Sequence, residues 1–420
     1  MIHRSALFAS VFLAGFAPAT ASAGKELRDT DLVNDPDNVP AELGPDEIHG
    51  FPALSTFEPL REIAPGLDYF ELELPGPIRA YVLRLDLRQP GYDLIVGHPY
   101  GERESQIKER TTGIFQRYDE QLNAEGTDVV AAINGSFFGH GNDIIGLLAS
   151  EGRMVGVSRE ELYWPTLVWT KANRPLALMD PRLSTPTLTL GNETRMRIDV
   201  LNEDLGEDAI GLYSQDWGDT LIVPAGVAVA RVTRTSGPVA PNSRVTGVLG
   251  EVSVKEGGDL VVEIPGDGVL IAASGSQAAL LSSDVDVAIA YVFDDAPELA
   301  QADMMMDMGG YIVRDGEPYR EQWPTYAEDF RKRHPRSLAA WDRQYLYLAV
   351  IDGRQEGYSV GVSFDELARF STEVLDAREA LNFDGGGSSA LVLEGELKNR
   401  PSDPQGERFV GNAVLLTRKK

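Results

Sequence analysis

The chain has 420 residues, of which 43% are hydrophobic and 25% are charged, and its formal net charge at pH 7 is -27. This hydrophobic content is sufficient for the core of one large domain or of two ordinary ones. A surface so acidic repels nucleic acids and anionic membranes, so we expect no nucleic-acid partner. The absence of cysteine excludes disulfides, thiolate metal sites, a cysteine nucleophile and a lipid-anchored cysteine.

Residues 1–23 have the features of a secretory signal peptide. They begin with basic residues, continue with an apolar run over 6–17 and end with the small residues Ala21-Ser22-Ala23. We expect cleavage between Ala23 and Gly24 and a bacterial protein that is periplasmic or secreted. The later apolar stretch 285–293 has the length of a strand and cannot span a bilayer, so no membrane anchor is expected.

The first elements follow an acidic segment. Residues 24–60 are rich in Asp, Glu, Pro and Asn with little periodicity, which predicts a poorly ordered leader. Strand-like segments predict strands over 67–74 and 78–87, and in the second of these apolar residues alternate with polar ones. Apolar residues at helical spacing predict a helix over 107–122, and an apolar strand over 129–133 should follow.

The middle of the chain is predicted to be mostly β structure. From about 166 to 290, short β-branched runs alternate with turn residues. The methionines at 304–306, next to glycine, are typical of flexible core filling. Further strands are expected over 346–351 and 380–383.

Between these last two strands, Ser363 and Glu366 have the spacing of a capping box at the start of a helix. The elements together predict an α+β fold: a mixed β-sheet core flanked by helices, with a β-rich middle section. We expect one domain over 61–418 that includes the section at about 166–290.

The predicted strand at 380–383 leads into an unusual loop. It contains Asp384, then Gly385, Gly386 and Gly387, then Ser388. Consecutive glycines lose much backbone entropy on folding, so they are expected where the chain takes positive φ or lies against a ligand. Amides without neighbouring side chains can bind an anion, and the loop also offers a carboxylate and a hydroxyl. The alternative interpretation is a tight hairpin turn.

A basic patch at 331–336 stands out in this acidic chain. Within it, His334 and a proline precede Arg336 and Ser337. A guanidinium suits a phosphate or carboxylate, and the serine can add a hydrogen bond. The alternative is a solvated loop whose cations pair with acidic neighbours such as those at 328–329.

Polar residues also follow two other predicted strands. Asn134 can donate to a sugar hydroxyl or phosphate oxygen, and Gly135 can let a substrate come close, although both would also suit a simple turn. Asp384 and Asp352 each lie at a strand end beside glycine, where a carboxylate can serve glycoside chemistry or cap a turn. If the strands before Asn134 and Asp384 share a sheet, their loops can meet at one pocket.

Other catalytic schemes lack their signatures. The serines at 388 and 389 do not have the glycine spacing of a nucleophile elbow, and there is no Walker loop or dinucleotide fingerprint. The five histidines show no metal-ligand spacing. We therefore expect no required cofactor, although the many carboxylates leave room for a divalent cation.

The order and spacing of these motifs resemble the phosphodiester glycosidase family. The resemblance covers 131–138, 309–316, 334–337, 350–354, the predicted helix that begins after Val362, 381–391, 399–402 and 410–413. Ser136, Ser337 and Ala340 depart from residues that are usual in the family, and these departures bear on the sugar that the protein prefers.

The resemblance implies hydrolysis between the anomeric carbon of a sugar and a phosphodiester oxygen. It implies that Arg336 binds the phosphate with the glycine amides and Ser388. Asp384 would activate water or stabilise an oxocarbenium-like centre, with Asp352 as the rival carboxylate, and a sugar-phosphate or glycan would be the substrate. The resemblance also makes His334 and Ser337 substrate-binding residues and has Asn134 and Asn412 orient the sugar.

Two other functions are compatible with the sequence. One is a glycosidase that acts on envelope or exopolysaccharide glycans whose linkage contains no phosphate. The other is a non-catalytic glycan-binding protein of the envelope. Phosphate-dependent release, phosphate-independent release and binding without release distinguish the three.

Overall fold

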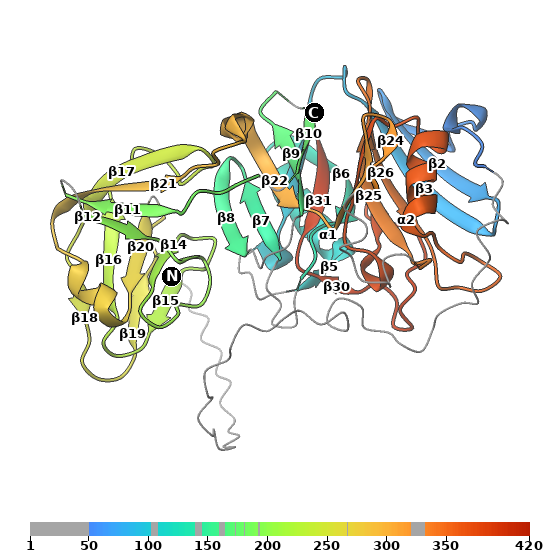
Figure 1. Ribbon diagram of the computed structural model, residues 1–420. Helices are drawn as coiled ribbons and strands as arrows, with labels where there is room; N and C mark the ends of the chain where they lie inside the picture. Colours follow the sequence, from blue (N-terminus) through green and yellow to red (C-terminus); the bar gives the residue numbers. More distant parts are fainter. Residues whose placement is uncertain are drawn as a thin grey trace.

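The computed structural model describes residues 50–101, 108–138, 145–158, 164–172, 174–179, 181–191, 194–266, 268–320 and 332–420. The predicted signal peptide and residues 24–49 of the predicted leader lie outside these ranges. In the described part, β-strands dominate, and the α-helices are α1 (Thr111–Asn123) and α2 (Phe364–Arg369) (Figure 1). No helix there is long and apolar enough to cross a membrane.

The largest sheet of the body lies at the right in Figure 1. Its strand order is β1-β2-β3-β26-β25-β27-β23-β24, and all of its pairs are antiparallel. The bounds are β1 Arg61–Ala64, β2 Leu67–Leu74, β3 Ile78–Asp86, β23 Gly310–Arg314, β24 Glu317–Pro318, β25 Arg336–Trp341, β26 Tyr345–Ile351 and β27 Glu379–Asn382.

A second antiparallel sheet of the body has the order β29-β28-β6-β31-β4. Its bounds are β4 Tyr92–Gly97, β6 Thr127–Asn134, β28 Leu391–Leu393, β29 Glu396–Leu397 and β31 Ala413–Lys419. Residues of both sheets, such as Leu83, Val350, Ile133 and Val414, share one buried cluster, so the two sheets pack face to face.

The helices cover the outer faces of this sandwich. Ile114 and Phe115 of α1 pack on Ala132 and Leu415 of the second sheet. Phe364 and Leu367 of α2 belong to the cluster on the outer face of the first sheet. Helices therefore flank a sheet core as expected, but they are few, so the α+β prediction is confirmed only in outline and the protein is β-rich.

A third sheet connects the body to the middle section. Its order is β10-β9-β22-β7-β8, with bounds β7 Gly146–Ser150, β8 Arg153–Ser158, β9 Pro165–Thr170, β10 Pro175–Met179 and β22 Ala302–Asp307. The methionines at 304–306 lie on β22 and are buried, as expected for core filling.

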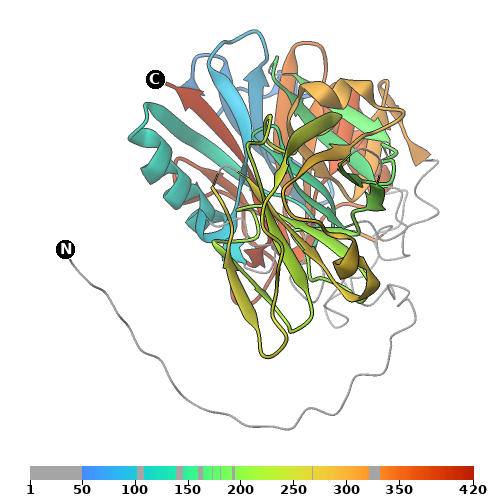
Figure 2. The same cartoon turned by 90° about the vertical axis from the view of Figure 1, so that its left-hand side faces the viewer.

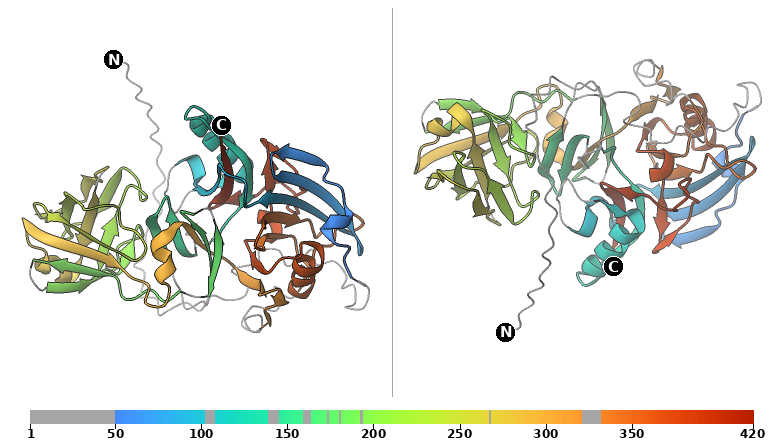
Figure 3. Two further views of the ribbon diagram at one scale, coloured as in Figure 1. Left: turned by 90° about the horizontal axis from the view of Figure 1, so that it is seen from above. Right: turned by 90° about the horizontal axis from the view of Figure 1, so that it is seen from below.

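The middle section forms a separate lobe, at the left in Figure 1 and facing the viewer in Figure 2. From above and from below, the third sheet lies between the lobe and the body (Figure 3). The main sheet of the lobe has the order β12-β11-β21-β17-β16-β20-β14-β13, and β18 pairs with β16. The bounds are β11 Thr187–Leu190, β12 Thr194–Arg197, β13 Val200–Leu201, β14 Ile210–Tyr213, β16 Ala228–Thr233, β17 Ser243–Leu249, β18 Ser253–Val254, β20 Val269–Ala273 and β21 Val285–Tyr291.

Two short antiparallel pairs complete the strands of the described residues. They are β15 (Thr220–Val223) with β19 (Leu260–Glu263), and β5 (Glu109–Arg110) with β30 (Phe409–Val410). Among the described strands only β13 and β14 pair in parallel. The expectation of a mixed sheet core is therefore wrong, because the strands of the body follow hairpins and antiparallel crossings rather than β-helix-β units.

Local sequence signals account for several element boundaries. Ser363 caps α2, accepting a hydrogen bond from the amide of Glu366 at 3.3 Å, while the Glu366 carboxylate accepts from the amide of Ser363 at 3.0 Å. The predicted capping box is thus confirmed. Helix α2 continues into a π-helical turn over Phe370–Val374.

The end of the predicted leader is packed rather than solvated. Phe51 and Leu54 are buried, and the ring of Phe51 meets that of Phe370 edge to face at 6.5 Å. The amide of Phe51 also donates to Glu373 Oε2 at 2.7 Å. The expectation of poor order is therefore wrong for residues 50–60, because two large apolar side chains cover the end of α2.

Candidate active site

The loops that follow β6 and β27 meet, although the two strands belong to different sheets. The amide of Asp384 donates to the carbonyl of Gly135 at 3.1 Å, and Asn134 Nδ2 donates to the carbonyl of Asp384 at 2.6 Å. The two loops therefore meet as hypothesised. They meet because the two sheets pack face to face, and not because the two strands lie in one sheet.

The side chain of Asn134 is engaged within the protein. It is fully buried, and its Oδ1 accepts from Ser337 Oγ at 2.7 Å and from the amide of Ala390 at 3.1 Å. Both acceptor positions of the amide oxygen are thus occupied, and one of its two donors holds Asp384. In this arrangement Asn134 and Ser337 position the Asp384 loop, whereas the sequence suggested that they contact the substrate.

Gly135 and Asn412 form a second cross-connection. The amide of Gly135 donates to the carbonyl of Asn412 at 3.1 Å, and the amide of Ser136 donates to Asn412 Oδ1 at 2.8 Å. A Cβ atom on Gly135 would lie 2.1 Å from Asn412 Oδ1. The glycine therefore makes room for Asn412, and not for the substrate as expected.

Two of the three glycine amides are already occupied. The amide of Gly385 donates to Asp384 Oδ1 at 2.9 Å, and that of Gly386 donates to the carbonyl of Pro335 at 2.9 Å. Gly386 also has a φ of +61°, which favours glycine. The hypothesis that all three amides bind a phosphate needs correction, because an amide bonded within the protein has no hydrogen left to donate.

Two glycines of the run lie against the guanidinium group of an arginine. A Cβ atom on Gly385 would instead lie closest to the carbonyl oxygen of Pro335, at 2.9 Å. On Gly386 it would lie 3.1 Å from Arg354 Nη2, and on Gly387 it would lie 2.3 Å from Arg408 Nη2. The absence of side chains thus lets guanidinium groups approach the backbone beside Asp384.

Asp384 is half-buried, and its charge depends on the cations around it. Burial raises the pKa of its carboxyl to about 6. The neighbouring Ser388 hydroxyl, Arg408, the amide of Gly385 and Lys108 oppose this rise because they favour the charged form. The carboxyl is therefore mostly ionised at neutral pH and becomes protonated a little below it.

Arg336 lies beneath the surface. It is buried, its guanidinium carbon is 4.6 Å from the centre of the Phe364 ring, and its Nε donates to the carbonyl of Val362 at 3.2 Å. Burial, and then the positive charge of Arg354, lower the pKa of Arg336 to about 9. Arg336 thus contributes positive potential from below, and Arg354 lies closer to solvent.

His334 holds Arg354. Its Nδ1 accepts a hydrogen bond from Arg354 Nε at 3.1 Å, and its backbone pairs with that of Val362. Arg354 has a φ of +57°, which is uncommon for a residue other than glycine. The nearby Arg333 of the predicted basic patch pairs with Glu366 instead, and Arg331 lies outside the described residues.

Asp352 is an anchor between loops. It is buried, and its carboxylate accepts hydrogen bonds from Asn399 Nδ2 at 3.1 Å, from the amide of Arg400 at 2.9 Å and from the hydroxyl of Tyr358 at 3.2 Å. Burial raises the pKa of Asp352, and these hydrogen bonds oppose the rise. The arrangement suits a carboxylate that holds the 399–400 segment in place.

Three cations near Asp384 were missed in the sequence. Arg408 forms a two-pronged ion pair with Asp403, at 2.7 and 2.9 Å, beside Gly387. Lys108 Nζ lies 4.0 Å from the centre of the Phe138 ring, and burial lowers the pKa of this lysine. Of these three, only Arg354 lies in a recognisable sequence pattern, because it follows the Asp-Gly pair at the end of a strand. Lys108 and Arg408 come close to Asp384 through tertiary packing alone.

The described residues contain no group of three His, Asp or Glu side chains placed to hold a metal ion.

Several solved structures share this fold. A hypothetical protein from Synechocystis is 22% identical, with a TM-score of 0.63 over 84% of this chain and 62% of that one. A Burkholderia pseudomallei protein provisionally described as exported is 20% identical, with a TM-score of 0.61 over 82% of this chain and 74% of that one. The chain thus spans less than two thirds of the Synechocystis protein, and both likenesses show the fold alone.

The catalytic domain of zebrafish N-acetylglucosamine-1-phosphodiester alpha-N-acetylglucosaminidase, auto-inhibited by its pro-peptide, is 12% identical, with a TM-score of 0.44 over 87% of this chain and 86% of that one. No curated protein sequence matches the chain. Residues 230–417, which include β25 to β30, most of β31 and the Asp384 loop, match the model of the phosphodiester glycosidase family, and this match confirms the family resemblance.

Proposed function

We propose that the protein hydrolyses the bond between the anomeric carbon of a sugar and a phosphodiester oxygen. The observation that carries the proposal is the surroundings of Asp384: a half-buried carboxylate beside Arg408 and Lys108, in a loop where Gly386 and Gly387 admit the guanidinium groups of Arg354 and Arg408. In a chain with a net charge of -27, such a concentration of cations suits an anionic substrate.

The two parts of the site have different tasks in this proposal. Arg354, Arg408 and Lys108 bind the phosphodiester and stabilise the negative charge that grows on the departing phosphate. A phosphate monoester leaves readily, so protonation of the leaving group matters less than in ordinary glycosides. Asp384, ionised at neutral pH, assists at the anomeric carbon, where positive charge develops.

The remaining motif residues act through these groups. Asn134 and Ser337 hold the carbonyl side of Asp384, and His334 holds Arg354. Arg336 adds positive potential from beneath the glycine run. Asp352 fixes the segment that carries Arg400.

We also propose that the protein works outside the cytoplasm. The basic start, apolar run and small-residue end of residues 1–23 support export, and a protein of similar fold is provisionally described as exported.

A panel of sugar-1-phosphodiesters, assayed beside aryl glycosides of the same sugars, tests the proposal. We expect sugar release from phosphodiesters only, lost in Asp384→Asn and lowered at least tenfold in Arg354→Met. Arg343→Met is the matched control, because Arg343 is exposed in the turn at the opposite end of β25 from Arg336, and it should keep full activity. Equal release from aryl glycosides would identify a phosphate-independent glycosidase, and binding without any release would identify a glycan-binding protein.

A further inference from the structure

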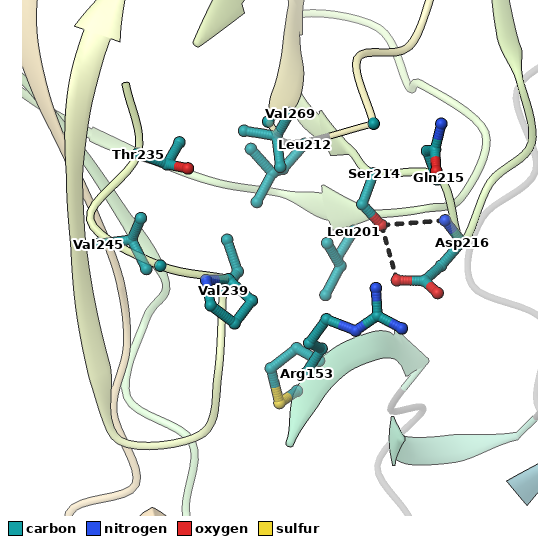
Figure 4. Close-up of a pocket in the computed structure, with 15 residues that line it drawn as sticks. Arg153, Leu201, Leu212, Ser214, Gln215, Asp216, Thr235, Val239, Val245 and Val269 are labelled. Carbon is teal, nitrogen blue, oxygen red and sulfur yellow. Dashed lines mark hydrogen bonds between the residues drawn. The ribbon is translucent and has the colours of Figure 1, made fainter. Parts of the chain in front are cut away.

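A cavity lies in the lobe, where the sheet that contains β14, β17 and β20 meets strand β8 (Figure 4). Its volume is about 310 Å³. An apolar cavity of about 150 Å³ holds a benzene molecule, so this one can hold roughly a dozen non-hydrogen atoms. Its size lies at the lower end of the range for small-molecule sites.

Hydrogen bonds fix the two sides of the cavity relative to each other. The amide of Met154, on β8, donates to the carbonyl of Val239 in the lobe at 2.8 Å. Asn202 Nδ2, from the lobe, donates to the carbonyl of Val155 on β8 at 2.8 Å. The cavity is therefore formed before any ligand arrives, and a ligand need not order it.

Aliphatic side chains form most of the wall. Met154, Leu201, Leu212, Val245 and Val269 are all buried and line the cavity. None of the lining residues in the described part of the chain is aromatic. The wall therefore suits an aliphatic body better than a flat ring.

One end of the cavity is polar. Asp216 is only 3% exposed, and its Oδ2 accepts from Ser214 Oγ at 2.9 Å, which in turn accepts from Asn202 Nδ2 at 3.0 Å. Arg153, whose side chain is 32% exposed, extends its guanidinium toward the same end (Figure 4) and donates to Glu151 at 2.6 Å. This end of the cavity therefore carries both a carboxylate, which accepts hydrogen bonds, and a guanidinium, which donates them.

We propose that this cavity binds a neutral amphipathic molecule with an aliphatic body and a hydroxyl head. A hydroxyl both donates and accepts, so it can donate to Asp216 and accept from Arg153. An ammonium or a carboxylate head would meet one opposite and one like charge at this end, so the two interactions oppose each other, and the cost of taking a charged head out of water remains. The inference does not depend on the proposed hydrolysis.

Titration of the full chain with octan-1-ol tests whether the cavity binds such a molecule. Binding is measured by isothermal titration calorimetry and by changes in the methyl NMR signals of methionine. We expect saturable binding at one site, with octanoate and octylammonium at least tenfold weaker. No saturable binding of octan-1-ol, or equal binding of all three probes, would overturn the proposal.

Two variants locate the site. A Cβ atom on Gly237, at the cavity, would have no atom within 4 Å, and the same holds for Gly257, which does not line it. Gly237→Trp should lower octan-1-ol affinity at least tenfold, and Gly257→Trp should leave it unchanged. Asp216→Asn should lower the affinity for octan-1-ol about tenfold and narrow its advantage over octanoate. If Gly237→Trp and Asp216→Asn bound octan-1-ol as tightly as the unmodified protein, the assignment of the cavity would be contradicted. Sugar release by the same variants tests the proposed active site separately.

Discussion

Asn134 and Asp384 are 250 positions apart in the chain, and the side-chain amide of the first donates to the main-chain carbonyl of the second at 2.6 Å. This bond crosses between the two packed sheets of the body. Because Asn134 Oδ1 also accepts from Ser337 and Ala390, one buried side chain joins the ends of strands β6, β25 and β27 to the start of β28. The position of the candidate catalytic carboxylate therefore depends on this asparagine.

Replacement of Asn134 by alanine should lower both stability and turnover. It removes three buried hydrogen bonds and leaves their partners unsatisfied, which costs about 2–4 kcal/mol of unfolding free energy. Denaturant unfolding should show this loss, and kcat should fall more than KM rises because Asp384 loses its support. Ser337→Ala, which removes one of the three bonds, should cost about 1 kcal/mol. Unchanged stability and turnover in Asn134→Ala would contradict this role.

Gly387→Ala tests whether the glycine run serves the arginines. The added Cβ would lie 2.0 Å from Asp403 Oδ1 and 2.3 Å from Arg408 Nη2, so the ion pair must move. Side-chain ends move at little cost, so the melting temperature should change little, whereas kcat/KM on a phosphodiester should fall at least tenfold. Gly257→Ala, which adds a methyl group in open space, should change neither quantity. A fully active Gly387→Ala protein would refute the dependence on Arg408.

Asp384→Asn should abolish sugar release and yet stabilise the protein at neutral pH. The folded state raises the pKa of Asp384 from 3.8 to about 6, so the folded state binds more protons between these values and stability falls as pH rises through this window. Removal of the charge should recover roughly 2–3 kcal/mol at pH 7 and only about 0.5 kcal/mol at pH 4. Unfolding curves at both pH values measure this; a variant less stable than the unmodified protein at pH 7 would show that the carboxylate is not desolvated.

The pH dependence of kcat/KM follows from the same group. If ionised Asp384 is required, kcat/KM should fall below about pH 6. Lys108 and Arg408 both favour the charged form, so Lys108→Met should raise the pKa of Asp384 and shift the acid limb to higher pH. If the pH profile of kcat/KM is the same in Lys108→Met and in the unmodified protein, Lys108 does not interact electrostatically with Asp384.

Asp352→Asn should behave differently from Asp384→Asn. Asp352 accepts from Asn399, Arg400 and Tyr358, so the substitution disturbs an anchor and should cost about 1–3 kcal/mol of stability. The pH profile of kcat/KM should keep its shape. A folded Asp352→Asn protein without turnover would make Asp352 the catalytic carboxylate instead.

Local signals in the sequence were sufficient for several elements. The strand-like segment over 67–74 predicted β2 with its observed bounds, and the Ser363–Glu366 spacing predicted the start of α2. These features depend on side chains close together in the chain. The pairing of strands depends instead on residues far apart in the chain. The division into two facing sheets and the antiparallel order of the core could therefore not be predicted from local patterns in the sequence.

The same distinction applies to the site. The Asp384 loop and the Arg336 motif could be recognised as short sequence patterns. The hydrogen-bond partners of their atoms could not be predicted from these patterns. The amide of Gly385 donates to the side chain of Asp384, and the amide of Gly386 donates to the carbonyl of Pro335. Pro335 lies outside the loop, so its role could not be predicted from the loop sequence. Lys108 reaches Asp384 only because β5 pairs with β30 near Arg408, a contact between residues about 300 positions apart.

Hydrolysis of a sugar-1-phosphodiester in water enriched with oxygen-18 tests the central claim most directly. In the proposed reaction the bond between the anomeric carbon and oxygen breaks, and the water oxygen joins the sugar carbon while the phosphate keeps its four original oxygens. The account predicts sugar release with no oxygen-18 in the phosphate product, and no release by Asp384→Asn. Oxygen-18 in the phosphate, or release that persists in Asp384→Asn, would contradict it.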